Sequence, residues 1–366
     1  MSTFCASVMV AALSACSFSH DYKVVGTAEG AADGDSVFLS DGTSRLVLDT
    51  AIITNGEFVF SGRCDTTTFA VLRCEISADG STNICHVYLE RGADIKATLA
   101  KTPSKSRAVG SVCNDISARF EDTMSKIVAR IDSVEQMARD TTLTMVEQKR
   151  YESMSDSLYE NVYLTTYTNA VEANIKTVVG VHQLSKIAYA MELETIDSLL
   201  NLVPGEYHKD GAYVKLTERV ERMKAVDIGR PFVDFALPGL DGDTVRLSEV
   251  AAKNKVVMID FWASWCGPCR REMPNVVKAY EMFKDKGFEI VGVSQDYDAD
   301  AWRDAVKALG MSWRQCSALK GWDNEAIKAY AISSIPNTVI LKDGVIVAHQ
   351  LTGDDLLGKL GELIHE

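Results

Sequence analysis

The feature that most constrains this chain is a pair of cysteines at the junction of an apolar run and a helix. The run Lys255-Val-Val-Met-Ile-Asp260-Phe261 is followed directly by Trp-Ala-Ser-Trp-Cys-Gly-Pro-Cys at residues 262–269. Such a run indicates a buried strand that leads into a helix. Cysteines spaced as Cys266 and Cys269 on a first helical turn can bring their sulfurs together and cycle between dithiol and disulfide. Cys266 is expected near the helix N-terminus, where unpaired N–H groups favour a thiolate.

Two cysteines at this spacing can also form half of a zinc site. A structural zinc site needs a second pair of ligands. The sequence has no other Cys-x-x-Cys, and Cys316, His349 and His365 show no paired spacing. The Gly-Pro between the cysteines and the flanking tryptophans fit a redox loop better, so we predict no metal.

Length and charge bound the organisation and the partners of the chain. Its 366 residues suffice for two or three domains, and 46% apolar with 24% charged residues is typical of a globular protein. The net charge of -13 argues against nucleic acid, which requires a basic surface. We therefore expect no nucleic-acid partner.

The N-terminal residues resemble an export signal. Phe4 to Leu13 is an apolar run too short to span a bilayer, and it leads to Leu13-Ser14-Ala15-Cys16. Small residues before a cysteine resemble the cleavage box of a bacterial lipoprotein signal, which implies that residues 1–16 form a signal peptide with Cys16 as the lipidated residue. No Lys or Arg precedes the run, which departs from that pattern. The alternative is an ordinary N-terminus with a chance cysteine.

Residues 17–105 are predicted to form a small antiparallel β-domain. Short alternating runs are separated by Gly and Asp, as in a sandwich or barrel. Asp79-Gly80 is a typical hairpin turn, and a turn centred there places Cys74 opposite Cys85. These two cysteines are therefore expected either to form a cross-strand disulfide or to remain buried free thiols.

Residues 106–227 are predicted to be a helical segment. Apolar residues recur at steps of three and four from Ile116 to Ala138, which indicates an amphipathic helix, and further helical patterns cover about 143–200 and Tyr213 to Met223. No pattern in residues 17–227 points to chemistry. We expect this part of the chain to recognise a partner or to dimerise.

Residues 228–366 are predicted to form an α/β domain. A buried strand at Val256–Trp262 leads to the helix that carries the cysteines and Pro274, and a second strand begins at Phe288. Further helices, a hairpin around Asp343-Gly344 and a last helix follow. This order predicts a mixed sheet covered by helices on both faces.

The order of these elements, with Cys-Gly-Pro-Cys and the later Ile335-Pro336, resembles the thioredoxin fold. The stretch from Asp260 to Pro274 more closely resembles the membrane-tethered TlpA/ResA-like thiol–disulfide oxidoreductases. Residues 229–235 and 241–248 are also similar to that group, although such proteins usually have Pro-Asp-Phe where this chain has Val-Asp-Phe at 233–235. The resemblance covers roughly residues 228–366. The front part is similar only in layout to bacterial lipoproteins that place a β-domain and helices before such a unit.

The resemblance implies roles for two cysteines and two acids. Cys266 is the attacking thiol, more exposed than Cys269, and Cys269 is the resolving thiol. A thiol of pKa about 8.5 is only about 3% ionised at pH 7, so a lowered pKa favours exchange. Asp260 matches the buried acid of thioredoxin and Glu272 the acid of the ResA-like site, and either would accept the proton of Cys269. The alternatives are a hydrogen-bonded strand residue for Asp260 and a solvated first-turn acid for Glu272.

The remaining candidate residues surround the cysteines. Gly267 and Pro268 form the active-site loop. The resemblance implies a cis peptide before Pro336 and a backbone at Ile335 that pairs with an extended substrate. Trp265 offers a flat apolar surface for docking, or else it only packs.

The leading interpretation is a thiol–disulfide oxidoreductase of the cell envelope, facing the periplasm and lipid-anchored to a bacterial membrane. We expect it to reduce protein disulfides through a mixed disulfide, with no cofactor beyond the Cys266–Cys269 pair. Nine cysteines are many for a reducing cytosol, which favours this compartment. The expected partners are oxidised envelope proteins such as cytochrome c apoproteins, an upstream membrane thiol reductant, the membrane, and a second copy in a homodimer.

Two other functions compete with this interpretation. A thiol peroxidase of peroxiredoxin type shares the segment before the cysteines. Such enzymes have Thr or Ser where this chain has Ala263 and Pro where it has Ile259. The other alternative is a non-catalytic envelope binding module with an accessory thioredoxin domain.

Overall fold

The computed structural model describes residues 21–365, and the chain forms two compact units. Unit 1 extends to Ile187 and includes Leu199–Tyr213, whereas unit 2 comprises Ala188–Ser198 and the chain from Val214 onward. This differs from the predicted division at residues 17–105, 106–227 and 228–366. The helices of the middle segment up to residue 187 belong to the same unit as the β-strands, while most of its last two helices belongs to unit 2. No helix among the described residues is both long and apolar enough to cross a bilayer.

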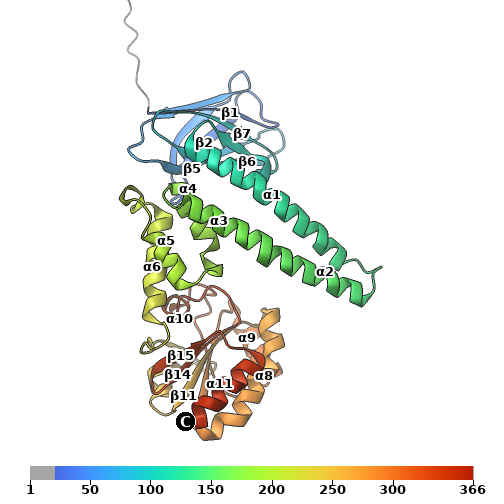
Figure 1. The fold of residues 1–366 in the computed structure, drawn as a ribbon, viewed down its shortest axis with the longest axis vertical. Coiled ribbons are helices and arrows are strands. Elements are labelled where there is room, and N and C mark those ends of the chain that lie inside the picture. Colours follow the sequence, from blue (N-terminus) through green and yellow to red (C-terminus); the bar gives the residue numbers. More distant parts are fainter. Residues whose placement is uncertain (1–20, 366) are drawn as a thin grey trace, which may run out of the picture. The chain divides into compact units, whose positions relative to one another are not determined.

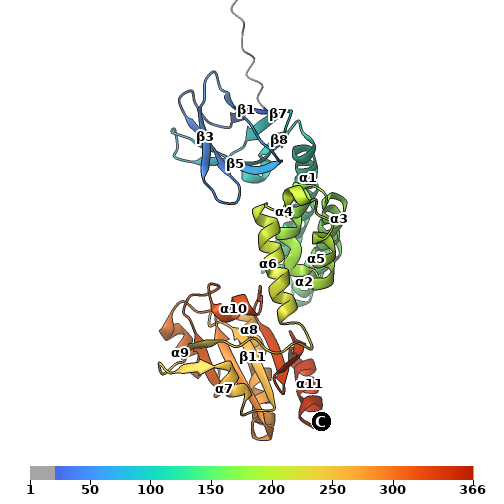
Figure 2. The same cartoon turned by 90° about the vertical axis from the view of Figure 1, so that its left-hand side faces the viewer.

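Unit 1 contains two four-stranded sheets that share one core, ordered β4-β1-β7-β8 and β3-β2-β5-β6 (Figure 2). All neighbours pair antiparallel as predicted, except that β1 pairs parallel with β7, which the long excursion through β2 to β6 allows. The strands are β1 Tyr22–Ala28, β2 Ser36–Asp41, β3 Val47–Ile52, β4 Phe58–Gly62, β5 Thr68–Glu75, β6 Thr82–Leu89, β7 Ala93–Leu99 and β8 Arg107–Val109.

The hairpin between β5 and β6 corrects the prediction for two cysteines. Cys74 pairs with Asn83, and Cys85 pairs with Leu72, so the two cysteines are not opposite each other. The turn is a four-residue loop at residues 77–80, closed by Ile76 and Ser81, with Gly80 in the left-handed region at φ 69°. This loop is centred one residue earlier than the predicted Asp-Gly turn. Both cysteines are buried free thiols.

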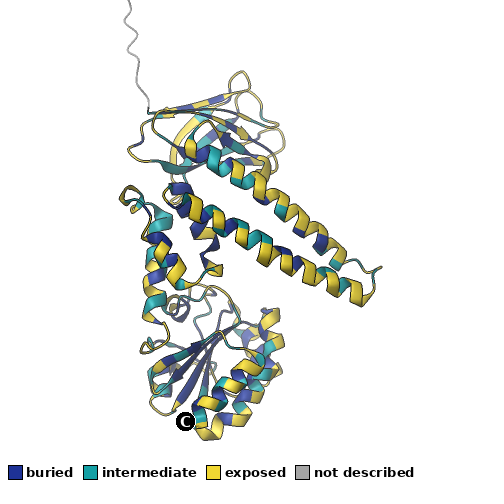
Figure 3. Ribbon diagram, viewed as in Figure 1, coloured by how far each residue is buried: buried dark blue, intermediate teal, exposed yellow. Residues whose placement is uncertain are grey.

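The helices of unit 1 follow the strands. Asn114, near the start of α1, joins this helix to β6, because its side-chain oxygen accepts from the Tyr88 backbone N–H and its amide donates to the Tyr88 carbonyl. Much of the surface of α1 and α2 is exposed (Figure 3). The helices of unit 1 after β8 are α1 Val112–Ala138, α2 Met145–Leu158, α3 Thr165–Asn174 and α4 Val178–Ile187, with a π-helical turn at Tyr159–Leu164. Two more helices, α5 Leu193–Leu200 and α6 Gly211–Ala225, lie mostly in unit 2.

Unit 2 has the thioredoxin fold. Its five-stranded sheet has the order β13-β12-β11-β14-β15, in which β11, β12 and β13 are parallel and β14 and β15 antiparallel to their neighbours. Helices cover both faces (Figure 1), which confirms the predicted mixed sheet. The elements are β9 Ala236–Pro238, β10 Thr244–Arg246, α7 Leu247–Ala251, β11 Val256–Trp262, α8 Gly267–Phe283, β12 Phe288–Ser294, α9 Ala299–Ala308, β13 Arg314–Ser317, α10 Glu325–Ala329, β14 Asn337–Lys342, β15 Val345–His349 and α11 Gly353–His365.

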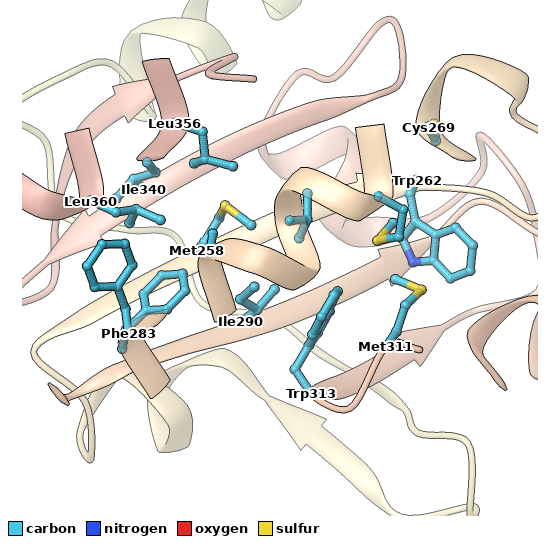
Figure 4. Close-up of a cluster of buried hydrophobic side chains, with 14 of the residues drawn as sticks. Met258, Trp262, Cys269, Phe283, Ile290, Met311, Trp313, Ile340, Leu356 and Leu360 are labelled. Carbon is cyan, nitrogen blue, oxygen red and sulfur yellow. The ribbon is translucent and has the colours of Figure 1, made fainter. Parts of the chain in front are cut away.

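The central strand β11 is buried along its whole length because both of its faces are covered. Its alternate residues belong to two different cores. Met258 and Trp262 pack beneath α8, α9 and α11 (Figure 4), whereas Ile259 and Phe261 pack on the side of α7 and α10. By the same alternation, Asp260 faces the core beneath α8.

Candidate active site

The turn between β11 and α8 is held by the carboxylate of Asp296. Asp296 follows β12 and is only 1% exposed. Its carboxylate accepts from the backbone N–H of Ser264 at 3.0 Å and from the Ser264 hydroxyl at 2.5 Å. The hydroxyl of Ser294 donates to the same carboxylate at 2.6 Å. Sequence analysis missed Asp296, although its position just after a predicted parallel strand was a usable signal.

The two cysteines of the motif are joined by a disulfide at the start of α8. Their Cα atoms are 5.3 Å apart. Cys266 is the N-cap residue, and its sulfur accepts from the backbone N–H of Cys269 at 3.1 Å. This N–H group and the helix dipole would stabilise a thiolate at Cys266 once the disulfide is reduced.

The sulfurs are more enclosed than the sequence suggested. Cys266 is 4% and Cys269 1% exposed, so the expected difference in exposure is small in the oxidised state. The surrounding loop residues Trp265, Gly267 and Pro268 are exposed, Trp265 to 54%. The exposed part of the motif is therefore its loop, whereas both sulfurs are buried.

Asp260 is a buried acid in the core that contains Cys269. Its residue is 2% exposed, and its Oδ2 atom has no hydrogen-bond partner among the residues that the structure describes. Burial raises the pKa of Asp260 to about 7, and the negative charge of Glu272 adds to this shift. A carboxyl group with this pKa can exchange a proton near neutral pH.

Glu272 is half-buried and held by two hydrogen bonds. One of its oxygens accepts from the backbone N–H of Gly353 at 2.7 Å, and the other accepts from the Asn275 side chain at 3.1 Å. Gly353 is the first residue of α11, so the carboxylate lies at the positive end of that helix. The side chain is thus held by α11, and Glu272 lies beyond the first turn of α8 rather than on it.

The loop before β14 brings a third segment to the disulfide. The peptide bond between Ile335 and Pro336 is cis, as the resemblance implied. The carbonyl oxygen of Ile335 lies 3.8 Å from the sulfur of Cys266, although the two residues are 69 positions apart. Both loop residues are half-buried, so part of their surface faces solvent.

The other cysteines are not part of this arrangement. Cys316, in β13, is fully buried, and burial raises the pKa of its thiol to about 12. The described free cysteines of unit 1 are also buried, namely Cys64, Cys74, Cys85 and Cys113. Cys16, the predicted lipidation site, lies outside the described residues. Within residues 21–365, no group of three or more His, Cys, Asp or Glu side chains is arranged to hold a metal ion.

Comparison with known proteins matches the two ends of the chain to different families. Residues 228–350 match the AhpC/TSA family, and residues 22–116 match a domain of unknown function, DUF4369. The thiol-disulfide oxidoreductase ResA of Bacillus thuringiensis (strain Al Hakam) is 30% identical over 130 residues, which cover 35% of this chain and 72% of that protein. ResA of Bacillus subtilis (strain 168) is 28% identical over 130 residues, 36% of this chain and 70% of that protein.

Solved structures similar to unit 2 include two from Bacteroides. The thioredoxin domain of a thiol-disulfide oxidoreductase from Bacteroides vulgatus is 33% identical, with a TM-score of 0.36, and covers 38% of this chain and 98% of that one. The C-terminal domain of a putative thiol-disulfide oxidoreductase from Bacteroides thetaiotaomicron is 30% identical, with a TM-score of 0.37, and covers 38% and 97%.

Proposed function

The chain belongs to the ResA family of thiol-disulfide oxidoreductases, and from this premise we propose that it reduces disulfide bonds of envelope proteins with the Cys266–Cys269 pair. The observation that carries the proposal is the disulfide at the N-terminus of α8, next to the cis-proline loop and in the same core as Asp260. The cysteine pair itself is the redox group.

Reduction of a substrate takes two exchange steps. In the reduced enzyme the Cys266 thiolate attacks one sulfur of the substrate disulfide, which forms a mixed disulfide and releases the other substrate sulfur as a thiolate. The Cys269 thiolate then attacks the Cys266 sulfur, the Cys266–Cys269 bond forms, and the second substrate thiolate leaves. The released thiolates take up protons, and two electrons have passed from the enzyme to the substrate.

Asp260 accepts the proton of Cys269 before the second step. Its raised pKa makes it an effective base near neutral pH, because a base works best when its pKa is close to the ambient pH. Glu272 tunes this group, since its charge disfavours ionisation of Asp260. The structure described here is the oxidised product of this step.

Ile335 and Trp265 bind the substrate polypeptide. The carbonyl of the half-buried Ile335 lies 3.8 Å from the Cys266 sulfur, which supports a role in which its backbone pairs with an extended segment beside the reacting sulfurs. Trp265 directly precedes Cys266, and its exposed indole offers an apolar surface to the substrate. Gly267 and Pro268 complete the exposed loop.

The direct test is trapping of the mixed disulfide. In the full chain, Cys269→Ser lacks the resolving thiol, so it should accumulate a covalent complex with a disulfide-bearing protein such as insulin. Cys266→Ala should form no complex and should not reduce insulin. Cys316→Ala, a buried cysteine outside the pair, is the control that should keep turnover. Unchanged insulin reduction by Cys266→Ala would overturn the proposal.

The direction of exchange follows from the reduction potential. A titration of the Cys266–Cys269 pair against glutathione measures it, and about 30 mV changes the exchange equilibrium tenfold. We expect a potential close to that of thioredoxin, which favours reduction. A potential near that of disulfide-forming enzymes would reverse the proposed direction.

The envelope location depends on residues outside the described part. A lipid anchor at Cys16 would hold the enzyme on the membrane, where a membrane thiol reductant could supply its electrons. Cys16→Ser should shift the full chain from the membrane fraction to the soluble fraction, and an unchanged distribution would contradict the anchor. Homodimer formation through unit 1 stays a prediction.

A peroxidase function is the second candidate, because residues 228–350 match the AhpC/TSA family. Ala263 and Ile259, at the positions where peroxiredoxins have a hydroxyl and a proline, are both buried apolar residues. We therefore expect the reduced enzyme to consume hydrogen peroxide no faster than an ordinary thiol. Rapid peroxide turnover that is lost in Cys266→Ala would favour the peroxidase.

A further inference from the structure

A cavity in unit 2 lies outside the disulfide site. Its volume is about 510 Å³, a size typical of ligand pockets. Its walls come from residues 189–193, from α6 and the residues after it, from the segment between α10 and β14, and from the end of β15. In both views the C-terminal end of α6 lies close to α10 (Figures 1 and 2).

This cavity adjoins the cis-proline loop. Ser333 and Asn337 line it, and each is two residues from Ile335, a span of at most about 7 Å along the chain. Asn337 pairs with Phe261 near the end of β11, so the cavity lies at the end of the sheet that carries the disulfide. A chain that pairs with Ile335 therefore passes near the cavity.

Arg219, on α6, lines the cavity and forms no ion pair with any residue that the structure describes. Its Nη2 donates to the hydroxyl of Ser333 at 3.2 Å, whereas its Nε is buried and has no hydrogen-bond partner in the described part of the chain. Burial and the positive charge of Arg222 lower the pKa of Arg219, and no carboxylate opposes them. A partly buried cation without a counter-charge costs free energy that a bound anion would offset.

Among the described residues that line the cavity, Arg219 is the only Lys or Arg. Burial lowers the pKa of His349, although the Val226 backbone and the charge of Asp227 oppose this, so the ring is mainly neutral at pH 7. Glu192 and Asp227 also line the cavity, yet neither forms an ion pair with Arg219 within residues 21–365. Much of the remaining wall is apolar, including Met191, Met223, Ile228 and Ile332.

We propose that this cavity, the Arg219 pocket, binds a carboxylate side chain of the disulfide-bearing polypeptide substrate. An extended chain advances about 3.3 Å per residue, so a substrate segment paired at Ile335 places an Asp or Glu two to four residues from its cysteine at the pocket. The guanidinium binds the carboxylate through charge-assisted hydrogen bonds, and the apolar wall contacts its methylene groups. This inference rests on the proposed reductase function and names its preferred substrates.

The pocket would favour acidic substrates, which the negative net charge of the chain disfavours. The chain carries a net charge of -13, which on average repels acidic polypeptides. A preference for an acidic residue near the reacting cysteine therefore requires a local cation. Arg219 supplies one next to the loop that pairs with substrate.

The test compares two peptides that differ in one group. Each has blocked ends and one cysteine in a disulfide with neutral 2-thiopyridine, and carries Glu or Gln three residues from that cysteine. Release of 2-thiopyridone gives the rate constant of exchange with the reduced full chain. We expect the Glu peptide to react about tenfold faster with the unmodified enzyme, because a charge-assisted hydrogen bond is lost with Gln.

Variants on α6 test whether Arg219 causes the preference for the Glu peptide over the Gln peptide. Arg219→Gln should lower the Glu-to-Gln rate ratio to about one, while Arg219→Lys should retain part of it, since the charge stays and the planar fork is lost. Arg222→Gln is the matched control, because Arg222 lies on the same helix but does not line the cavity, and it should keep the ratio. A ratio of one in the unmodified enzyme, or an unchanged ratio in Arg219→Gln, would overturn the inference.

Two further measurements separate the possible failures. Exchange with the Gln peptide tests the reductase alone, so reaction with both peptides at equal rates rejects only the pocket. If neither peptide reacts, the reductase proposal fails, and fluorescence anisotropy of Ser-for-Cys peptides still shows whether Glu binds more tightly than Gln. N-acetylglutamate α-amide tests a small-molecule source of the carboxylate. If it competes as well as the whole peptide does, the pocket serves free acids and the polypeptide assignment is wrong.

Discussion

Replacing Asp260 by Asn should change the pH dependence of the stability of unit 2. The carboxyl group is buried, and its pKa is raised to about 7 from 3.8. The folded state therefore holds this proton more tightly than the unfolded chain does. As pH rises from about 4 to 7, the unfolded chain loses the proton first, so this group destabilises the fold increasingly with pH. Asn has a similar shape and does not titrate.

The magnitude follows from these two pKa values. Linkage gives a contribution of Asp260 to the free energy of unfolding that falls by about 3 kcal/mol between pH 5 and pH 8. Above pH 8 the loss relative to strongly acidic solution approaches about 4 kcal/mol. The difference in unfolding free energy, wild type minus Asp260→Asn, should therefore fall by about 3 kcal/mol from pH 5 to pH 8.

Denaturant unfolding followed by tryptophan fluorescence measures this difference for unit 2 alone. The chain has five tryptophans, and all of them lie in unit 2: Trp262, Trp265, Trp302, Trp313 and Trp322. The matched control is Asp323→Asn, an exposed acid that pairs with Lys328. That ion pair holds the pKa of Asp323 below its usual value, so its effect should be constant between pH 5 and pH 8.

A constant difference between wild type and Asp260→Asn across this pH range would refute the reasoning. It would mean that Asp260 stays ionised in the fold at pH 5, as an acid of ordinary pKa does. The proposed role of this carboxyl group as the base for Cys269 would then lose its physical basis, because a group fully ionised at pH 5 is a weak base.

Three further predictions concern other parts of the chain. Glu272→Gln removes the charge that raises the pKa of Asp260, so the rate of mixed-disulfide resolution, measured against pH, should reach half of its maximum at a lower pH. Asn114→Ala should lower the stability of unit 1 by about 2–3 kcal/mol in far-UV circular dichroism melts, because it leaves two buried backbone groups of Tyr88 unpaired. Maleimide, followed by peptide mass spectrometry, should label five buried thiols only after unfolding: Cys64, Cys74, Cys85, Cys113 and Cys316.

The elements that carry the cysteines could be predicted because their signal is local. The apolar run at Val256–Trp262 has the length and composition of a buried strand, and the structure gives the strand these bounds. The helix after it continues through Pro274, as predicted, since one missing N–H does not end a helix that is packed along its length. The hairpin around Asp343-Gly344 was equally clear, because its turn residues determine its register.

Other parts of the fold depend on contacts that no local pattern reveals. Strand β13 has the sequence Arg-Gln-Cys-Ser and was missed, because its strand conformation comes from pairing with β12. The hairpin β9–β10 and the short helix α7 were also missed. In the β5–β6 hairpin the turn residues were identified, but the loop at residues 77–80 is centred one residue before the predicted turn, and this shift changed the partner of Cys74.

In the site, too, some features have a local sequence signal and others depend on distant segments. The motif supplies the two thiols, the N-cap position and the candidate acids, all within residues 260–272. Their environment comes from distant segments: Asp296 holds the turn, Ile335 faces the sulfur of Cys266, and Gly353 binds Glu272 across 81 positions. The charge of Glu272 raises the pKa of Asp260, and the N–H at the start of α11 holds the carboxylate that carries this charge. On the proposed mechanism, the position of α11 therefore helps to set the pH at which Asp260 accepts the proton of Cys269.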